Sequence, residues 1–444
     1  MDLFFLRVLS NPLSFPFLML VYFCCILMIL VKLTKEMIAS CKNKFNTILS
    51  LSIISFLLSS SLIFYNFYNM PKAGFEIDDG IYAIGSFVLK NSGVDNQNNT
   101  KVFPFFPCSE IKYHEKSIYS VSLRSLPAYS QSYVQCFIKP GFESIKLENA
   151  LFSLFSSVLV GFTFFMISGK VTQSLFCSSL FNIIPWVHLM ANLHPEGSAY
   201  LFGSSCFLFA FYYYLIKKSF LSYVNLLLSM IMFFLSWAPA FIVLPVSIIG
   251  FTILVSFYSK SDRLLMLRFF ISSVLVLFFI YIGFHEEYGF KWNLGRAASL
   301  GCLPGLSPFD YQLIFEGLKN NWHIYLTDYF GYLSPEFLFL CGDGNLRHNS
   351  GFGGQVLLSL AVAFYFALYF FGTKKINIHY KILFLYLLIT ILPYSLCTEG
   401  YRTAFLHLPL HAMRQSAMII PVVLIIMVGL VKIHEYNKNT LIFI

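Results

Sequence analysis

Three carboxylates stand within four positions of this chain, directly after an apolar run at residues 47–69. They are Glu76, Asp78 and Asp79, in a sequence whose charged residues make up only 11% of the total. Aspartate is a favoured residue at the start of a helix, where the helix dipole stabilises a negative charge. One cap needs one acid, so one aspartate of an adjacent pair can cap while the other faces a cavity and takes part in catalysis. The residues alone leave capping and catalysis both open.

The residues that follow this pair predict a helix lying along the membrane surface. Ile77, Ile81, Ile84 and Val88 recur at positions i, i+4, i+7 and i+11, and therefore form one apolar stripe. The two aspartates would then stand at the N-terminus of this helix, beside the mouth of a membrane span.

A second polar segment, "SPEFLFLCGDGNLRHNSGFGG" at 334–354, mixes acids, cations and glycines with aromatic residues. Its first residues predict the start of a helix with serine as the cap, and residues 342–345 predict a tight turn. Its last glycines allow a backbone to pack closely or to bend. The segment is either a well-ordered loop or a site for the head group of an anionic lipid. Its polar candidates for substrate or phosphate binding are Glu336, Asp343, Arg347 and His348.

A third group of polar residues is cationic. His411 and Arg414 stand before the last apolar run at positions i and i+3, so they share one helix face. Arginine can bind a phosphate through two parallel hydrogen bonds, and histidine can donate a proton. A phosphate site is one interpretation, and an arginine that merely extends to lipid phosphates is the other. His194 and Glu196 precede another apolar run, where simple interfacial capping is the favoured interpretation.

The composition indicates the scaffold that positions these residues. Hydrophobic residues make up 57% of the 444 positions, and the charged fraction is well below the roughly one quarter of a soluble domain. The chain is therefore predicted to be a multi-pass integral membrane protein. The formal charge of +9 fits basic cytoplasmic loops and does not call for nucleic acid as a partner. The ten cysteines form no CxxC pair and no Cys/His cluster at zinc spacing, so no metal site is predicted, although the sequence leaves room for a divalent metal.

About eleven runs are apolar and long enough to be membrane-spanning helices, since a span needs roughly 20 apolar residues. They lie near 13–33, 47–69, 149–168, 174–192, 196–216, 221–238, 240–258, 264–284, 353–372, 380–396 and 414–434.

Lysine and arginine in the short loops predict the orientation. They gather in alternate loops, which the positive-inside rule places in the cytoplasm. The N-terminus is then outside and the C-terminus is cytoplasmic. The three long polar segments, 70–148, 285–352 and 397–413, all fall on the outer face. We expect one polytopic membrane domain over 1–444, with large outer loops at 70–148 and 285–352 and no separate soluble domain.

The quoted segments resemble those of the polytopic GT-C glycosyltransferases, in particular the branch of protein O-mannosyltransferases and the lipid A aminoarabinose transferase. "DDGIYAIGSFVLKNSGVD" from Asp78 is similar to the acidic pair that opens a membrane-parallel helix in that family. "RSLPAY" at 124–129, "IIPWVHLMANLHPEGSAYLF" at 183–202 and "LHAMRQ" at 410–415 are looser counterparts. "YLSPEFLFLCGDGNLRHNSGFGGQ" at 332–355 is the most similar segment. The resemblance implies an all-α GT-C fold with membrane-parallel helices in the two large outer loops.

The resemblance also implies an activity and roles for the residues. Such enzymes move a sugar from a polyprenyl-phosphate carrier to an acceptor glycan, lipid or protein on the extracytoplasmic face, with inversion at the anomeric carbon. Asp78 or Asp79 would be the general base that accepts the proton of the acceptor hydroxyl. The charge that develops on the leaving phosphate would be offset by cations. The candidates for that role are His411, Arg414, Arg347 and Arg124. Asp343 would orient the acceptor or hold its loop.

Two other functions remain open. A transporter or lipid flippase would line a path through the bilayer with charges, whereas the charges here gather in the loops and no paired Gly/Pro interruption of helices is evident. A non-catalytic scaffold would tolerate replacement of both aspartates.

Overall fold

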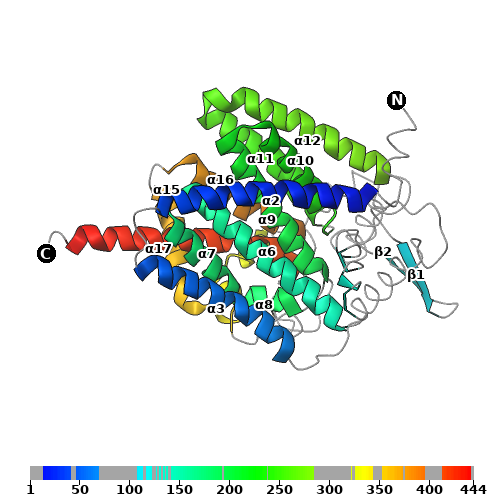
Figure 1. Ribbon diagram of the computed structural model, residues 1–444, viewed down its shortest axis with the longest axis horizontal. Helices are drawn as coiled ribbons and strands as arrows, with labels where there is room; N and C mark the ends of the chain where they lie inside the picture. The colour runs from blue at the N-terminus through cyan, green and yellow to red at the C-terminus, as the bar shows by residue number, and fades with distance from the viewer. Residues whose placement is uncertain are drawn as a thin grey trace. The chain divides into compact units, whose positions relative to one another are not determined.

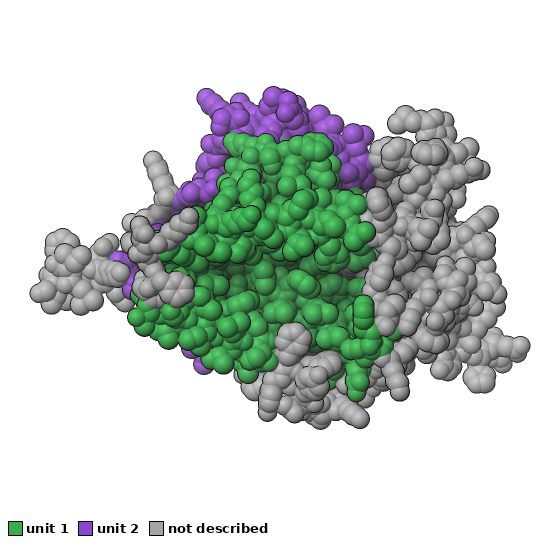
Figure 2. Space-filling model, in the orientation of Figure 1, with its two compact units in different colours: residues 1–182, 190–240 green, residues 183–189, 241–444 purple. Residues whose placement is uncertain are grey.

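The computed structural model describes residues 14–41, 47–69, 108–113, 117–122, 127, 130–131, 134–135, 137–138, 142–192, 195–237, 239–284, 322, 326–343, 353–373, 376–395 and 413–441. The chain divides into two compact units, which Figure 2 colours separately. Unit 1 comprises Met1–Asn182 and Met190–Ala240, and unit 2 comprises Ile183–Leu189 and Phe241–Ile444.

Unit 1 is a bundle of long apolar helices (Figure 1). Its helices are α2 (Ser14–Cys41), α3 (Thr47–Asn69), α6 (Phe142–Ser168), α7 (Val171–Ile183), α9 (Pro195–Lys217) and α10 (Phe220–Phe234). Helix α9 packs against α6 and α10, α3 packs against α6, and α2 packs against α10. Helix α9 is buried along almost its whole length, so it forms the centre of this unit.

Small residues let α6 and α7 pack closely. The hydroxyl of Ser174 donates to the carbonyl of Gly161 at 2.7 Å, and the hydroxyl of Ser178 donates to the carbonyl of Ser157 at 2.8 Å. Close packing of small residues with hydroxyl hydrogen bonds is a common way for helices to associate in a bilayer, where lipid gives no hydrophobic drive between them.

The long polar segment at 70–148 contains a short β-hairpin. Strand β1 (Cys108–Tyr113) pairs antiparallel with β2 (Ser117–Ser122), and Cys108 lies opposite Ser122. The predicted all-α membrane class is confirmed by the described helices, and this two-stranded hairpin is an addition that the sequence did not indicate.

Unit 2 contains the remaining helices. They are α11 (Ala240–Tyr258), the 3₁₀ turn η1 (Lys260–Asp262), α12 (Arg263–Phe284), the π-helix η2 (Glu336–Leu340), the 3₁₀ turn η3 (Leu358–Leu360), α15 (Ala361–Thr373), α16 (Ile378–Ser395), the 3₁₀ helix η5 (Met413–Met418) and α17 (Ile419–Leu441). Helix α17 packs against α15 and α16, and η5 packs against α16. Helix α8 (Pro185–Asn192) joins the two units along the chain.

Each of the eleven apolar runs expected from the sequence overlaps a helix, although one run is interrupted and the first five residues of the run at 353–372 are not helical. The run at 174–192 is divided at Ile184 into α7 and α8, because Pro185 has no backbone N–H and starts a new helix. Among the described residues, four helices are long and apolar enough to cross a membrane, or up to six if each bent helix pair is one span. The count of eleven spans therefore stays a prediction.

Basic loops that were assigned to one side of the membrane meet within each unit. In unit 1, Lys217 at the end of α9 forms an ion pair with Glu36 near the end of α2, at 2.8 Å. In unit 2, the ammonium of Lys381 lies 3.4 Å from the ring centroid of Tyr258, so the start of α16 and the end of α11 share one end. These contacts agree with the predicted grouping of the loops, while the side of the membrane on which they lie stays a prediction.

Candidate functional site

Most of the residues predicted to do chemistry lie outside the described part of the chain. These are Asp78, Asp79, Arg124, His194, Arg347, His348 and His411. The backbone of Arg414 belongs to η5, and its side chain is not described. The roles given to these eight residues therefore stay predictions. Glu336, Asp343 and Glu196 are described, together with the elements around them.

The segment after Ser334 folds as a π-helix. The N–H of Phe337 donates to the Ser334 hydroxyl oxygen at 3.2 Å, so the predicted serine cap is confirmed. The N–H of Cys341 donates to the carbonyl of Glu336 at 2.7 Å, which is the i→i+5 bond of a π turn. Such turns are rare in proteins as a whole, and those that occur are often found at functional sites. The turn closes at Gly342, whose φ of 73° suits glycine, and this places Asp343 immediately after it.

The two acids of this segment lie in opposite environments. Glu336 is exposed at the start of η2, whereas Asp343 is only 2% exposed. A second buried carboxylate in the same loop, that of Asp328, is 6% exposed. Buried carboxylates need hydrogen-bonding partners because a charge is costly away from water. Asp343 thus belongs to the interior of the loop, which fits a holding role better than direct contact with solvent.

A glycine-rich strand of backbone runs along the π-helix. The N–H of Gln355 donates to the carbonyl of Phe337, and the N–H of Val356 donates to the carbonyl of Leu338 at 2.6 Å. A Cβ on Gly354 would lie 2.3 Å from the carbonyl carbon of Phe339, so only glycine fits at this position. The sequence prediction that the glycines allow close backbone packing is confirmed here.

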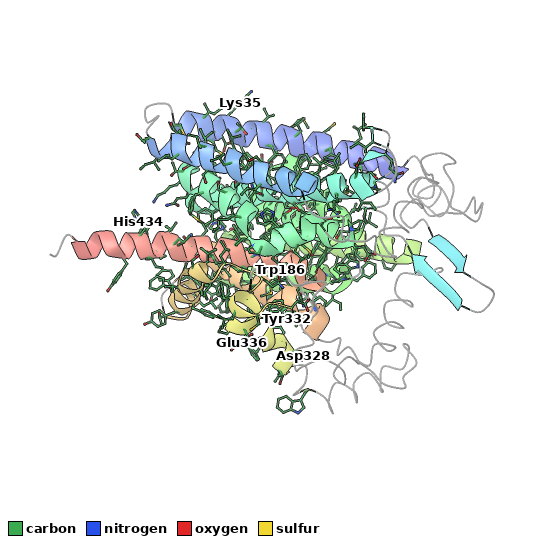
Figure 3. The ribbon with its side chains drawn as sticks, turned by 90° about the horizontal axis from the view of Figure 1, so that it is seen from below. Lys35, Trp186, Asp328, Tyr332, Glu336 and His434 are labelled. Atoms are coloured by element: carbon green, nitrogen blue, oxygen red, sulfur yellow. The ribbon has the colours of Figure 1, made fainter. Side chains whose placement is uncertain are left out.

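Aromatic side chains fill the space beneath this loop. The ring of Phe337 meets those of Trp186 and Tyr332 edge to face, with centroids 5.6 and 5.2 Å apart. The N–H of Trp186 also donates to the carbonyl of Gln355 at 3.0 Å. Figure 3 shows Trp186, Tyr332, Glu336 and Asp328 in one region of unit 2, apart from His434 on α17. The loop is therefore a packed structure and not an open connection.

The loop contacts the second half of α16. The hydroxyl of Tyr329 donates to the carbonyl of Leu388 at 2.8 Å, and the side-chain nitrogen of Gln415 donates to the carbonyl of Ile391 at 3.0 Å. Burial raises the pKa of Tyr329 to about 12, so its hydroxyl keeps its proton and can donate at neutral pH. Leu388 is seven residues beyond Lys381, or about 10 Å along a helix. The loop thus contacts α16 away from the basic residue at its start.

Unit 1 contains a buried carboxylate that the sequence interpretation missed. Glu148, near the start of α6, is 2% exposed, and one of its oxygens accepts a hydrogen bond from the hydroxyl of Ser130. In the orientation that satisfies both ends of its amide, Gln131 donates to the other oxygen of Glu148 at 2.5 Å and accepts from the hydroxyl of Ser144 at 2.6 Å. We call these four residues the Glu148 cluster. An acid five residues after another acid, at the head of an apolar run, was the only signal for it in the sequence.

The start of α9 lies beside this part of α6. The hydroxyl of Ser198 donates to the side-chain oxygen of Asn149 at 2.6 Å. Glu196 stands in the first turn of α9 and is half-buried, which agrees with its predicted place at a helix start. Ser198 is nineteen residues from Lys217, so the polar start of α9 lies about 28 Å from the Glu36 ion pair. That separation is close to the roughly 30 Å thickness of a hydrocarbon core.

Within the described ranges, no group of three or more His, Cys, Asp or Glu residues is arranged to hold a metal ion.

The fold and the site define an α-helical integral membrane protein with structured polar segments at one end of each unit. In structure the chain is similar to the apo form of the Archaeoglobus fulgidus oligosaccharyltransferase, with a TM-score of 0.49 and 15% sequence identity. The match covers 89% of this chain and 52% of that chain, so this chain spans about half the length of the structure it matches. At this TM-score and identity the similarity by itself assigns neither a family nor an activity.

No family model matches the chain. No curated protein is significantly similar to it in sequence.

Proposed function

We propose that the chain is a membrane glycosyltransferase of the GT-C type. It transfers a sugar from a polyprenyl-phosphate donor to an acceptor glycan, lipid or protein on the extracytoplasmic face. The donor lipid dissolves in the bilayer, and its head group emerges at the interface, where the polar segments of both units end.

The observation that carries the proposal is the packed loop at 326–343 and 353–356. It is the segment with the strongest family resemblance. It also combines a π turn, a buried aspartate and a glycine that tolerates no side chain, features that suit a segment holding active-site residues in place. A loop that served only as a connection would not need such a combination.

The proposed reaction is a single displacement. The acceptor hydroxyl attacks the anomeric carbon, its proton passes to Asp78 or Asp79, and the bond from that carbon to the phosphate oxygen breaks. The leaving polyprenyl phosphate gains negative charge, which His411 and Arg414 offset together with Arg347 or Arg124. The products are an inverted glycoside and a polyprenyl phosphate.

The proposal can be tested in cells by mass spectrometry of envelope lipids and glycans, with and without the gene. We expect loss of one glycan and accumulation of one polyprenyl-phosphate sugar, both reversed by the wild-type gene. Arg414→Gln is expected not to restore the glycan. The matched control is Arg268→Gln, an exposed arginine at the start of α12, and it is expected to restore it.

An unchanged set of lipids and glycans in cells without the gene would contradict the proposal. Accumulation of a lipid without loss of any glycan would favour the alternative, a transporter or lipid flippase.

A further inference from the structure

The Glu148 cluster joins two parts of the chain that belong to different elements. Ser130 and Gln131 stand at the end of the first outer loop, whereas Ser144 and Glu148 stand on the first two turns of α6. The two oxygens of one carboxylate therefore receive two donors from the same short segment. This arrangement fixes both the distance and the angle between the segment and α6.

The segment itself is folded. The N–H of Gln135 donates to the carbonyl of Gln131 at 3.0 Å, and the N–H groups of Phe137 and Ile138 both donate to the carbonyl of Val134, at 3.0 and 3.1 Å. The carbonyl of Gln131 thus accepts a hydrogen bond within a helical turn, while its side chain donates to the carboxylate of Glu148. Fastening it to α6 orders the residues that follow it.

The burial of Glu148 argues against a casual surface contact. A carboxylate is rarely buried unless hydrogen bonds compensate the loss of water, and breaking such a set leaves an unpaired polar group in the interior. Gln131 is fully buried as well, while Ser130 keeps partial exposure. Because Glu148 and Gln131 have almost no exposed surface, we expect an effect on the reaction to act through the loop.

We infer that Glu148 is a positioning residue, which fastens the end of the first outer loop to the outer end of α6 through Ser130 and Gln131. The effect on sugar transfer rests on the proposed function, because that loop carries Asp78, Asp79 and Arg124. The effect on the order of the segment does not rest on it.

The first experiment is amide hydrogen exchange of the protein in lipid nanodiscs. We expect Glu148→Ala to speed exchange in the peptide that contains the amides of Gln135 and Ile138 at least tenfold, with exchange in α9 unchanged. Glu148→Gln keeps an acceptor for Ser130, and its amide can bond to Gln131 after Gln131 turns over, so its exchange should stay within threefold of wild type. The matched control is Glu143→Ala, which removes an exposed carboxylate from the first turn of the same helix.

Ser130→Ala provides a milder variant in case Glu148→Ala does not fold. It removes one of the two donors, and we expect a smaller increase in exchange, confined to the same peptide. Exchange like that of wild type in both Ser130→Ala and Glu148→Ala would overturn the inference. So would a uniform increase over all helices of unit 1, because Glu148 would then stabilise the bundle and not the loop.

The second experiment measures transfer kinetics with a panel of polyprenyl-phosphate hexoses. Glu148→Ala should lower kcat at least tenfold, with KM for the donor changed less than threefold, and Glu148→Gln should restore kcat. A fall in activity that only follows the amount of folded protein would overturn the positioning role. Absence of transfer by wild type would refute the proposed function and leave the exchange result to judge the inference.

Discussion

Two polar regions of this protein are held in place by different interactions. In unit 1, the Glu148 cluster fastens a loop to a helix through side-chain hydrogen bonds to one buried carboxylate. In unit 2, the loop around the π-helix is held by backbone hydrogen bonds, by edge-to-face aromatic contacts and by a glycine that fits against another backbone.

The difference predicts how each region responds to change. A buried hydrogen-bonding cluster is sensitive to the loss of one donor or acceptor and tolerates an isosteric amide. A region held by packing is sensitive to volume, because interiors are close-packed and neither a missing ring nor an added methyl is easily accommodated. Both regions are predicted to be on the outer face, opposite the basic loops.

The largest expected effect is a difference in chemical labelling that tests whether the two regions lie on the outer face of the membrane. Cys341, at the end of the π-helix, is an exposed cysteine, and Cys41, at the end of α2, is a partly exposed one. In variants whose single cysteine is either Cys341 or Cys41, a membrane-impermeant maleimide added to intact cells should label Cys341 and leave Cys41 unlabelled. Cys41 should react once the membrane is permeabilised. Labelling of Cys41 alone in intact cells would reverse the predicted orientation.

Removing a ring from unit 2 should cost most in stability. Phe337→Ala deletes the ring that contacts both Trp186 and Tyr332, and such a deletion in a core costs about 4 kcal/mol. Denaturant unfolding in detergent measures the loss. Phe330→Ala, at a position 60% exposed, is the control and should cost less than about 1 kcal/mol. Equal losses for the two variants would mean that the aromatic cluster does not hold the loop.

Adding a methyl group to the same loop should have the next largest effect. Gly354→Ala places a Cβ against the backbone of Phe339 and should destabilise the loop by about 3 kcal/mol. Gly372→Ala is the matched control, because its Cβ would meet nothing within 4 Å. Since alanine favours a helix over glycine, that control should be stabilised by about 0.5 kcal/mol. Thermal unfolding of both variants separates the two results, and a Gly354→Ala protein as stable as wild type would refute the close backbone contact.

The smallest effect is expected for the partly exposed ion pair of unit 1. The side chains of Lys217 and Glu36 are 28% and 37% exposed. Solvent screens such a pair, so Glu36→Ala should cost less than about 1 kcal/mol. Glu36 and Glu148 are both glutamates of unit 1, so the stability losses of the two alanine variants can be compared directly. A loss for Glu36→Ala as large as that for Glu148→Ala would remove the distinction between the two.

The helices were predictable because long apolar runs give a strong signal, and each of the eleven runs overlaps a helix. The break before Pro185 was not expected, because the length of the run at 174–192 fits one span. The cap at Ser334 and the close contact at Gly354 followed from local residue types, which act over a few positions.

The Glu148 cluster could not be predicted in the same way. Its hydrogen bonds join residues thirteen to eighteen positions apart, and the register between the two segments depends on the folded loop. Glu148 also lies at the edge of an apolar run, where a charge is usually taken as the boundary of the membrane. The acidic pair at Asp78 and Asp79, by contrast, was selected by its spacing and by resemblance, and its position lies outside the described residues.

The most direct test of the proposed function is transfer by the purified protein in nanodiscs, supplied with a panel of radiolabelled polyprenyl-phosphate hexoses and an extract of envelope acceptors. Wild type is predicted to transfer one sugar, and the double variant Asp78→Asn, Asp79→Asn to be slower by about 10²- to 10⁴-fold, the usual contribution of a general base. Transfer at the wild-type rate by the double variant would contradict the catalytic role of the pair. No transfer from any of these donors by wild type would contradict the assignment as a glycosyltransferase.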